Sequence, residues 1–354
     1  MQIAGAWSWR ILAIVGVIAV FVFLIIQLRI IVIPIMVAVL VSSLLVPLSD
    51  WLQRHRWPRV LAIITVGVVA MGIVSGLVYL IVTQIRAGFP DLQKQSLVAW
   101  GEFKQFLLES PLHLTEAQIS QFGDDLWQTI QRDSGQWISG ALSIGSTAGH
   151  IVAGALIALF AIVLILIDGR NIWSWVVRLF PRKARPAIDG SGRAGWVTLS
   201  NFAKVQIFVA AIDAVGIGLG AVILQLPLAI PIAITVFLGS FIPIVGAVVT
   251  GAIAVFVALV YKDLVIALIM LGIVILVQQL ESHVLQPLVM GNAVKVHPLA
   301  VVLAVAAGSY LAGIPGALFA VPVVATLNVM IHYTARGEWR TNPNPDLKDV
   351  LRDE

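Results

Sequence analysis

The sequence has no cysteine in 354 residues, and only 11% of its residues are charged. The missing thiols exclude disulfides, cysteine-ligated zinc and a cysteine nucleophile, and they leave the redox compartment open. A hydrophobic fraction of 60% with so little charge exceeds what a soluble domain of this length can cover with polar surface. We therefore expect an integral membrane protein.

Long apolar runs without charge recur along the chain. A transmembrane helix needs about 17–25 apolar residues to cross a bilayer core of about 30 Å. Runs of that length or longer cover residues 11–28, 30–48, 60–85, 151–167, 214–261, 264–280 and 296–335. They predict an all-α, polytopic fold with about eight transmembrane helices. The first run is followed at once by a second, so we interpret it as a retained anchor and not as a signal peptide.

The distribution of positive charge predicts the orientation, because lysine and arginine collect in cytoplasmic loops. Residues 49–59 carry a basic excess of two and residues 168–204 an excess of five, whereas residues 84–149 carry an acidic excess of three. We therefore expect both termini in the cytoplasm. Because the basic residues lie in short loops between apolar runs, we expect no nucleic-acid partner.

These assignments divide the chain into four regions. Residues 1–85 are expected to form three transmembrane helices, residues 86–149 an extracytoplasmic helical segment, residues 150–335 a five-span core and residues 336–354 a cytoplasmic tail. Apolar residues at helical spacing predict that the second region is an amphipathic hairpin broken near Ser110. Such a hairpin serves either as a packing or oligomer contact or as a lid over a substrate path.

A second amphipathic segment follows the fourth span. Trp173, Trp175 and Phe180 precede a basic run at residues 181–185. Tryptophan and basic side chains favour the interface between headgroups and water. This pattern predicts an interfacial anchor on the inner leaflet.

The core contains an internal repeat, residues 227–261 and 298–333. Each copy begins with Pro-Leu-Ala and ends at a tyrosine, 34 residues after its first proline in one copy and 35 in the other. One helix of this length would extend about 51 Å, well beyond a bilayer core of about 30 Å. Proline removes a backbone donor and clashes with the preceding turn, so breaks are expected where proline and glycine cluster. These positions are Gly239, Pro243 and Gly246 in the first copy and Gly308, Pro315 and Gly316 in the second.

Broken backbone at membrane depth is tolerated only where protein covers it or water reaches it. Transporters often place binding sites at such breaks. The alternative is a pair of kinked helices with small residues for tight packing. Each copy either crosses the membrane once or turns back as a re-entrant hairpin, and the two arrangements place Lys262 on opposite sides.

Polar residues within apolar surroundings are candidates for a substrate or ion pathway. Asp213 lies in the fifth span, where a carboxyl group is costly and therefore suggests a function. Gln206 precedes it by two helical turns on the same face. Gln278, Glu281 and Ser282 share a stripe at the end of the next span. A carboxyl group there would bind a cation, carry a proton or bind a hydroxylated solute; the alternative is a water-exposed helix end.

No pattern typical of an enzyme occurs. Phosphate-binding loops, nucleophile elbows and metalloprotease motifs are missing, and no histidine spacing resembles a metal site. Gly216-x-Gly218-x-Gly220 is typical of helix packing, because no strand precedes it. We expect no catalytic residues, no cofactor and no metal.

Three stretches carry a family resemblance: GSFIPIVG at residues 239–246, QQLESHVLQPLVMG at 278–291 and VHPLAVVL at 296–303. With them the chain resembles the AI-2E transporters, also called the autoinducer-2 exporter or PerM-like family, and most closely their actinobacterial branch. The resemblance implies a multi-pass, homo-oligomeric transporter of the bacterial plasma membrane. Some members are associated with export of autoinducer-2 and others with sodium/proton antiport. Asp213 occupies a position that is often apolar in the family.

Three functional hypotheses follow. The leading one is secondary export of a small polar solute, such as a quorum signal, through a cavity at the breaks near Pro243 and Pro315. In it, a carboxyl group exchanges a proton or sodium ion. The second is a cation/proton antiporter that uses the same carboxyl groups. The third is a non-transporting membrane scaffold whose external hairpin recruits a partner.

Overall fold

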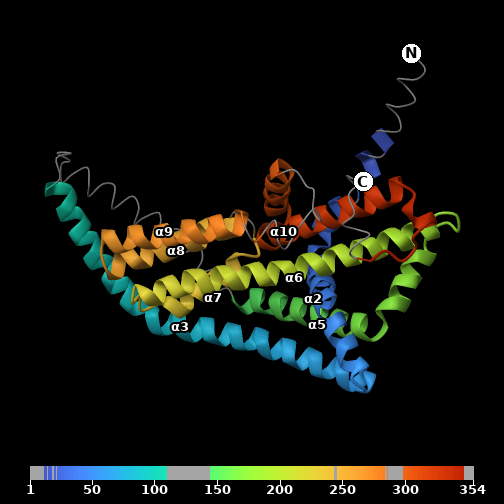
Figure 1. The fold of residues 1–354 in the computed structure, drawn as a ribbon, viewed down its shortest axis with the longest axis horizontal. Coiled ribbons are helices and arrows are strands. Elements are labelled where there is room, and N and C mark those ends of the chain that lie inside the picture. Colours follow the sequence, from blue (N-terminus) through green and yellow to red (C-terminus); the bar gives the residue numbers. More distant parts are fainter. Residues whose placement is uncertain are drawn as a thin grey trace, which may run out of the picture. The chain divides into compact units, whose positions relative to one another are not determined.

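A computed structural model describes residues 12–13, 15–17, 20, 22–109, 144–242, 245–283, 285 and 298–346. Its regular elements are helices, and no strand occurs within these ranges (Figure 1). Six helices in them are long and apolar enough to cross a bilayer: Arg29–Arg54, Arg59–Leu77, Val152–Arg178, Arg185–Ile223, Leu264–His283 and Leu299–Ala335. The expectation of an all-α, polytopic membrane protein is therefore confirmed.

The outer surfaces of these helices stay apolar. On helix α3 (Arg59–Glu109), Val68 is 65% exposed and Ile73 is 60% exposed. On α9 (Leu264–Leu280), Leu276 is 66% exposed. Such surfaces are costly in water, but lipid tails solvate them, and a helix satisfies its own backbone hydrogen bonds there. Large aliphatic side chains on the outside of these helices are thus suited to contact with lipid.

The chain divides into two compact units. The first contains Met1–Ile63, His150–Ser200 and Lys295–Val350, and the second contains Ile64–Gly149, Asn201–Val294 and Leu351–Glu354. In its described residues, the first unit holds α2 (Arg29–Arg54), most of α5 (Ile144–Arg178), the start of α6 (Arg185–Ile223), α10 (Pro298–Ala335) and the 3₁₀ turn η2 (Glu338–Arg340).

Helix α5 bends where its apolar part ends. Asp168 leaves helical geometry, with φ −139° and ψ 22°. Asn171 donates a hydrogen bond to Asp168 Oδ1 at 2.6 Å. The green ribbon of α5 changes direction at this end (Figure 1). The residues after Asp168 therefore run along a different axis from the apolar part of α5.

Glycines at the start of α6 let aromatic side chains approach closely. A Cβ atom at Gly192 would lie 1.9 Å from the Trp173 ring, and one at Gly190 would lie 2.8 Å from Tyr333 Oη. Trp173 Nε1 donates a hydrogen bond to Asp189 Oδ1 at 2.8 Å. This contact ties the end of α5 to the first turns of α6.

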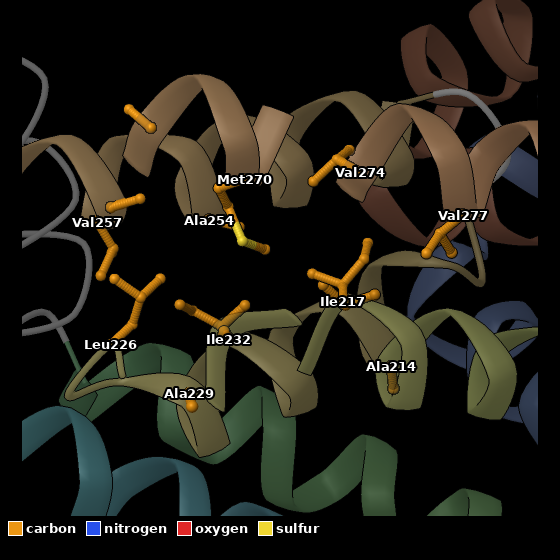
Figure 2. Packing of buried hydrophobic residues seen from close by; sticks show 14 residues of the cluster. Ala214, Ile217, Leu226, Ala229, Ile232, Ala254, Val257, Met270, Val274 and Val277 are labelled. Carbon is orange, nitrogen blue, oxygen red and sulfur yellow. The ribbon is translucent and has the colours of Figure 1, made fainter. Parts of the chain in front are cut away.

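The second unit has its core between α6, α7 (Ala229–Gly239), α8 (Val245–Tyr261) and α9. Figure 2 shows Ile217, Ile232 and Met270 directed into this common core. The glycine repeat of α6 sets the packing: Cβ atoms at Gly216 and Gly220 would meet Val277 and Ile273 of α9, and one at Gly218 would meet Ala233 of α7. All three distances from the added Cβ atom to its nearest neighbour are below 3 Å, and they define two faces of α6. Helix α6 therefore lies between α7 and α9.

The first copy of the repeat is two helices packed against each other. Helix α7 ends at Gly239 and α8 begins at Val245. A Cβ atom at Gly246 would lie 1.7 Å from the Gly239 carbonyl oxygen, so only glycine permits this backbone approach. Pro243, at which we expected a break, lies outside the described residues.

The second copy contains a break within α10. Ala312 (φ −140°, ψ 17°) and Gly313 (φ 63°, ψ −144°) leave helical geometry shortly before Pro315. The positive φ at Gly313 favours glycine. A Cβ atom at Gly316 would lie 1.9 Å from the Gly308 carbonyl oxygen. The two copies thus share one construction, in which a pair of glycines lets the backbone fold back on itself.

The expected count of about eight transmembrane helices stays a prediction. Residues 227–261 do not form one helix, since α7 has only 11 residues and α8 has 17. The first expected span is described only in part, and residues 110–143 of the expected extracytoplasmic hairpin lie outside the described residues. The residues before Ser110 belong to the same helix as the span Arg59–Leu77, because α3 runs over 51 residues to Glu109.

We predict that Gly246→Ala and Gly316→Ala each lower the unfolding temperature of the purified protein. The added methyl group would overlap a backbone carbonyl oxygen that cannot rotate away, and overpacking of this kind costs about 1–3 kcal/mol or more. Gly272→Ala in α9 is the matched control, because no atom lies within 4 Å of the new Cβ. Alanine is also the better helix former. Thermal melts in which all three variants behave alike would contradict the prediction.

Candidate functional site

Helix α6 carries two polar side chains into the apolar core of the second unit. Gln206 and Asp213 are seven residues apart, which is close to two helical turns, so they share a face. Gln206 is 7% exposed and Asp213 is 2% exposed. Asp213 is the one charged residue among the buried side chains of the described ranges. Both residues that the sequence pattern indicated are therefore buried.

Both side chains reach the same residue at the end of α7. Ser240 Oγ lies 3.0 Å from Asp213 Oδ2, to which it donates a hydrogen bond. Gln206 Nε2 donates to the Ser240 carbonyl oxygen at 2.6 Å. Ser240 follows Gly239, the last residue of α7, and is half-buried. The contacts connect the face of α6 to the break in the first copy of the repeat.

Ser240 was not among the candidate residues taken from the sequence. Its contacts span 27 and 34 residues, so no local periodicity reports them. A usable signal was present in the sequence, because Gly239-Ser240 recurs as Gly308-Ser309 in the second copy of the repeat. A hydroxyl group beside a helix break at membrane depth is a polar group that needs a partner.

The second oxygen of the Asp213 carboxyl group has no partner in the described part of the chain. Asp213 Oδ1 is fully buried there without a hydrogen bond. Asp213 also forms no ion pair with another described residue. An ionised carboxyl group in such surroundings is very costly unless it is neutralised or paired. Asp213 Oδ1 is therefore suited to hold a proton or another small cation.

The hydroxyl of Ser240 accommodates both protonation states of Asp213. Its single hydrogen has two acceptors in reach, Asp213 Oδ2 at 3.0 Å and the Val236 carbonyl oxygen at 2.9 Å. When the carboxyl group is ionised, the hydroxyl donates to it. When Oδ2 carries a proton, it donates to Ser240 Oγ while the hydroxyl donates to Val236. The proton can change place without rearrangement of the backbone.

The end of α7 strengthens the preference for positive charge. The last carbonyl groups of a helix carry the negative end of its dipole. Ser240 caps this end in α7, and Gln206 supplies one of the donors that the cap needs. A carboxyl group and a helix C-terminus beside each other both stabilise a cation between them.

The other candidate residues lie at the end of α9. Gln278 and Glu281 are half-buried and Ser282 is exposed. Ser282 Oγ donates to the Gln278 carbonyl oxygen at 2.8 Å, so this hydroxyl group is satisfied within its own helix end. Nearby, Val277 contacts Gly216 of α6, one helical turn after Asp213. The structure joins Gln206 and Asp213 at Ser240, whereas the residues of α9 form a more exposed polar group.

A metal centre is not evident in the ranges that the structure describes. They contain no group of three or more histidine, cysteine, aspartate or glutamate side chains that could hold a metal ion. The site consists of one carboxyl group, one hydroxyl group, one amide and helix-end carbonyl groups. Such oxygen donors suit a proton or an alkali cation better than a transition metal.

Comparison with known proteins agrees with this architecture. The model of the AI-2E family transporters matches residues 11–336. "Putative transport protein MT0215" of Mycobacterium tuberculosis is 40% identical over 349 residues, which are 99% of this chain and 94% of the relative. YrrI of Bacillus subtilis, named in the same way, is 25% identical over 85% of this chain and 86% of its own length. YhhT of Escherichia coli K12 is 20% identical over 87% of this chain and 86% of its own length. The chain therefore belongs to the AI-2E family of transporters.

Proposed function

We propose that this transporter is a secondary exporter of a small polar solute, such as a quorum signal, and that Asp213 couples export to a proton or sodium ion. The observation that carries the proposal is the buried Asp213 Oδ1, which has no hydrogen-bond partner among the described residues and lies beside a helix break. Intramembrane carboxyl groups typically mark ion or substrate paths. Membership of a transporter family supports the transport function itself.

In this proposal the α7–α8 pair is a re-entrant hairpin. Helix α7 has 11 residues and extends about 16 Å, too short for a bilayer core of about 30 Å. Asp213 lies ten residues before the end of α6 at Ile223, about 15 Å along the helix. Ser240 lies a similar distance from the start of α7. Since a short loop joins the two helices, both distances support a position of the cluster near half the depth of the bilayer.

The hairpin end then acts as a gate beside the ion site. Gln206 holds the Ser240 carbonyl group, and Ser240 holds the carboxyl group of Asp213. When Asp213 is protonated at Oδ2, Ser240 changes the hydrogen bonds that it makes, and this alters how firmly α7 is held against α6. The ion then binds with different affinity to two arrangements of the hairpin, and coupling requires such a difference in affinity.

The same proposal includes several finer points. The protein lies in a bacterial plasma membrane with both termini in the cytoplasm. It assembles as a homo-oligomer, as the family resemblance implies. Gln278, Glu281 and Ser282 line a second part of the path. The Gly308–Gly316 break in α10 forms the corresponding turn of the second copy.

A sodium(cation)/proton antiporter without an organic substrate is the second candidate, because the same buried carboxyl group would serve as its ion ligand. Reconstituted vesicles distinguish the two. A sodium gradient that drives a pH-sensitive dye signal without added solute favours the antiporter, whereas efflux of labelled autoinducer-2 without that signal favours the exporter. If neither occurs and deletion of residues 89–132 alone abolishes the cellular phenotype, the scaffold hypothesis gains.

We predict that a cysteine at Lys262 reacts with a membrane-impermeant maleimide added to intact cells. A re-entrant α7–α8 hairpin returns the chain to the outer side, whereas a single crossing would place Lys262 inside. The natural chain has no cysteine, so each single-cysteine variant has no labelling background. Arg56→Cys, in a loop that the charge distribution assigns to the cytoplasm, should stay unlabelled until the cells are permeabilised. Labelling of Lys262→Cys only after permeabilisation would exclude the hairpin topology.

We predict that Asp213→Asn reduces ion-driven transport in proteoliposomes to background while the protein stays folded. Asparagine has the same size and still accepts a hydrogen bond from Ser240, but it neither exchanges a proton nor neutralises a cation. An amide is also cheaper to bury than an ionised carboxyl group, so the unfolding temperature should be unchanged or higher. Asp263→Asn is the matched control: Asp263 is exposed and caps α9, a role in which asparagine serves equally well. Retained transport in Asp213→Asn would remove Asp213 from the mechanism.

We predict that Ser240→Ala tightens the apparent affinity for the coupling ion by about tenfold, because the Ser240 hydroxyl group stabilises the ionised, ion-free carboxyl group of Asp213 and loss of one buried hydrogen bond costs about 1–3 kcal/mol. In this variant Asp213 Oδ2 loses the hydrogen bond that the Ser240 hydroxyl group donates to it. Ser240→Thr keeps the hydroxyl group and should have an affinity close to that of the wild type. The measurement is the ion concentration that gives half-maximal transport, and equal values for alanine and serine at position 240 would show that this hydroxyl group has no part in coupling.

A further inference from the structure

The part of α5 that follows the bend at Asp168, together with the turn after it, has a surface that the transport site does not use. We call residues 169–183 the interfacial segment. Its inner face packs within the first unit: Trp173 lies against Gly192 and donates a hydrogen bond to Asp189, and Val177 is 8% exposed. The outer face of the interfacial segment is exposed and carries apolar and basic side chains.

A stripe of apolar side chains follows this outer face. Ile172, Trp175 and Leu179 recur at i, i+3 and i+7, the spacing of one helix face. They are 37%, 61% and 66% exposed. Phe180, directly after them, is also exposed. A tryptophan beside aliphatic side chains is typical of a helix that lies in the boundary between headgroups and acyl chains.

The interfacial segment also carries four cationic side chains, and it contains no acidic residue. Arg170, Arg178, Arg182 and Lys183 are all exposed. None of the four forms an ion pair within the part of the chain that the structure describes. Their charge is therefore available to an external partner.

The neighbouring Arg185 has a different role. Its guanidinium group donates to the carbonyl oxygens of Phe180 and Arg178, at 3.0 and 2.9 Å. These bonds satisfy carbonyl groups at the end of α5 that would otherwise lack donors. Arg185 thus holds the turn in place, and the four cations of the interfacial segment project from a fixed backbone.

We propose that the interfacial segment is a binding site for the headgroups of anionic phospholipids. Its apolar stripe enters the acyl boundary, and its guanidinium and ammonium groups bind the phosphate groups of two or more lipids. A nucleic acid would match the charge but would leave the stripe of Ile172, Trp175 and Leu179 in water. The site is independent of Asp213 and of the transported solute, so it stands whether or not export is the function.

The test uses the full-length, delipidated protein in detergent. Native mass spectrometry counts bound phosphatidylglycerol and, separately, bound phosphatidylcholine over a range of lipid concentrations. The wild type should bind phosphatidylglycerol about tenfold more tightly or better, because each cation near an anionic headgroup adds to the affinity. The variant with Arg170→Gln, Arg178→Gln, Arg182→Gln and Lys183→Gln should lose most of this preference and keep its phosphatidylcholine binding.

A control variant removes the same number of charges elsewhere: Arg29→Gln, Arg54→Gln, Arg56→Gln and Lys262→Gln, all at exposed positions. It should keep the preference for phosphatidylglycerol.

A further variant, Trp175→Ser with Leu179→Ser, should weaken the binding of both lipids, because the apolar stripe contacts their acyl chains. If the fourfold variant does not fold, Arg182→Gln with Lys183→Gln, beyond the end of α5, tests the same site with a smaller expected loss. Equal affinity for the two lipids in the wild type, or equal losses in the two fourfold variants, would overturn the proposal.

Discussion

The site depends on one constraint: a break in a helix within an apolar unit must find partners for its own backbone groups. At the end of α7 this is solved by a close backbone approach and by one side chain. Gly239 and Gly246 bring the two arms together, with a separation that leaves no room for a Cβ atom. Gln206 then donates to the Ser240 carbonyl oxygen. The same contacts that make the break tolerable also bring polar groups to the face of α6, and so they create the site.

Asp213 differs from Gln206 in that it contributes nothing evident to this structural solution. An apolar side chain of similar size would bury more cheaply at a position with 2% exposure, and one carboxylate oxygen finds no partner in the described ranges. A stable fold therefore gives no reason for a carboxyl group here. The arrangement makes sense if the carboxyl group exists in two states, one with and one without a bound cation, and if Ser240 satisfies both of them.

Much of this was accessible from the sequence. Hydropathy alone gives the all-α membrane class, and the excess length of residues 227–261 and 298–333 indicates a break in each. Helical periodicity places Gln206 on the face of Asp213. Ser240 was missed, because its partner is fixed by tertiary packing across 27 residues and not by local spacing. The stripe of Gln278, Glu281 and Ser282 illustrates the converse, since spacing predicts a shared face but burial depends on which helices lie beside it.

The two copies of the repeat separate what the fold needs from what the site adds. In both, a serine follows the first glycine and donates to the carbonyl oxygen four residues earlier: Ser240 to Val236 at 2.9 Å and Ser309 to Val305 at 2.8 Å. In both, a second glycine permits the close return of the backbone. These shared features belong to the construction of a broken segment. The bond of Ser240 to a buried carboxyl group is an addition to the first copy, and because the shared construction does not require it, this bond is the feature on which the proposed coupling role rests.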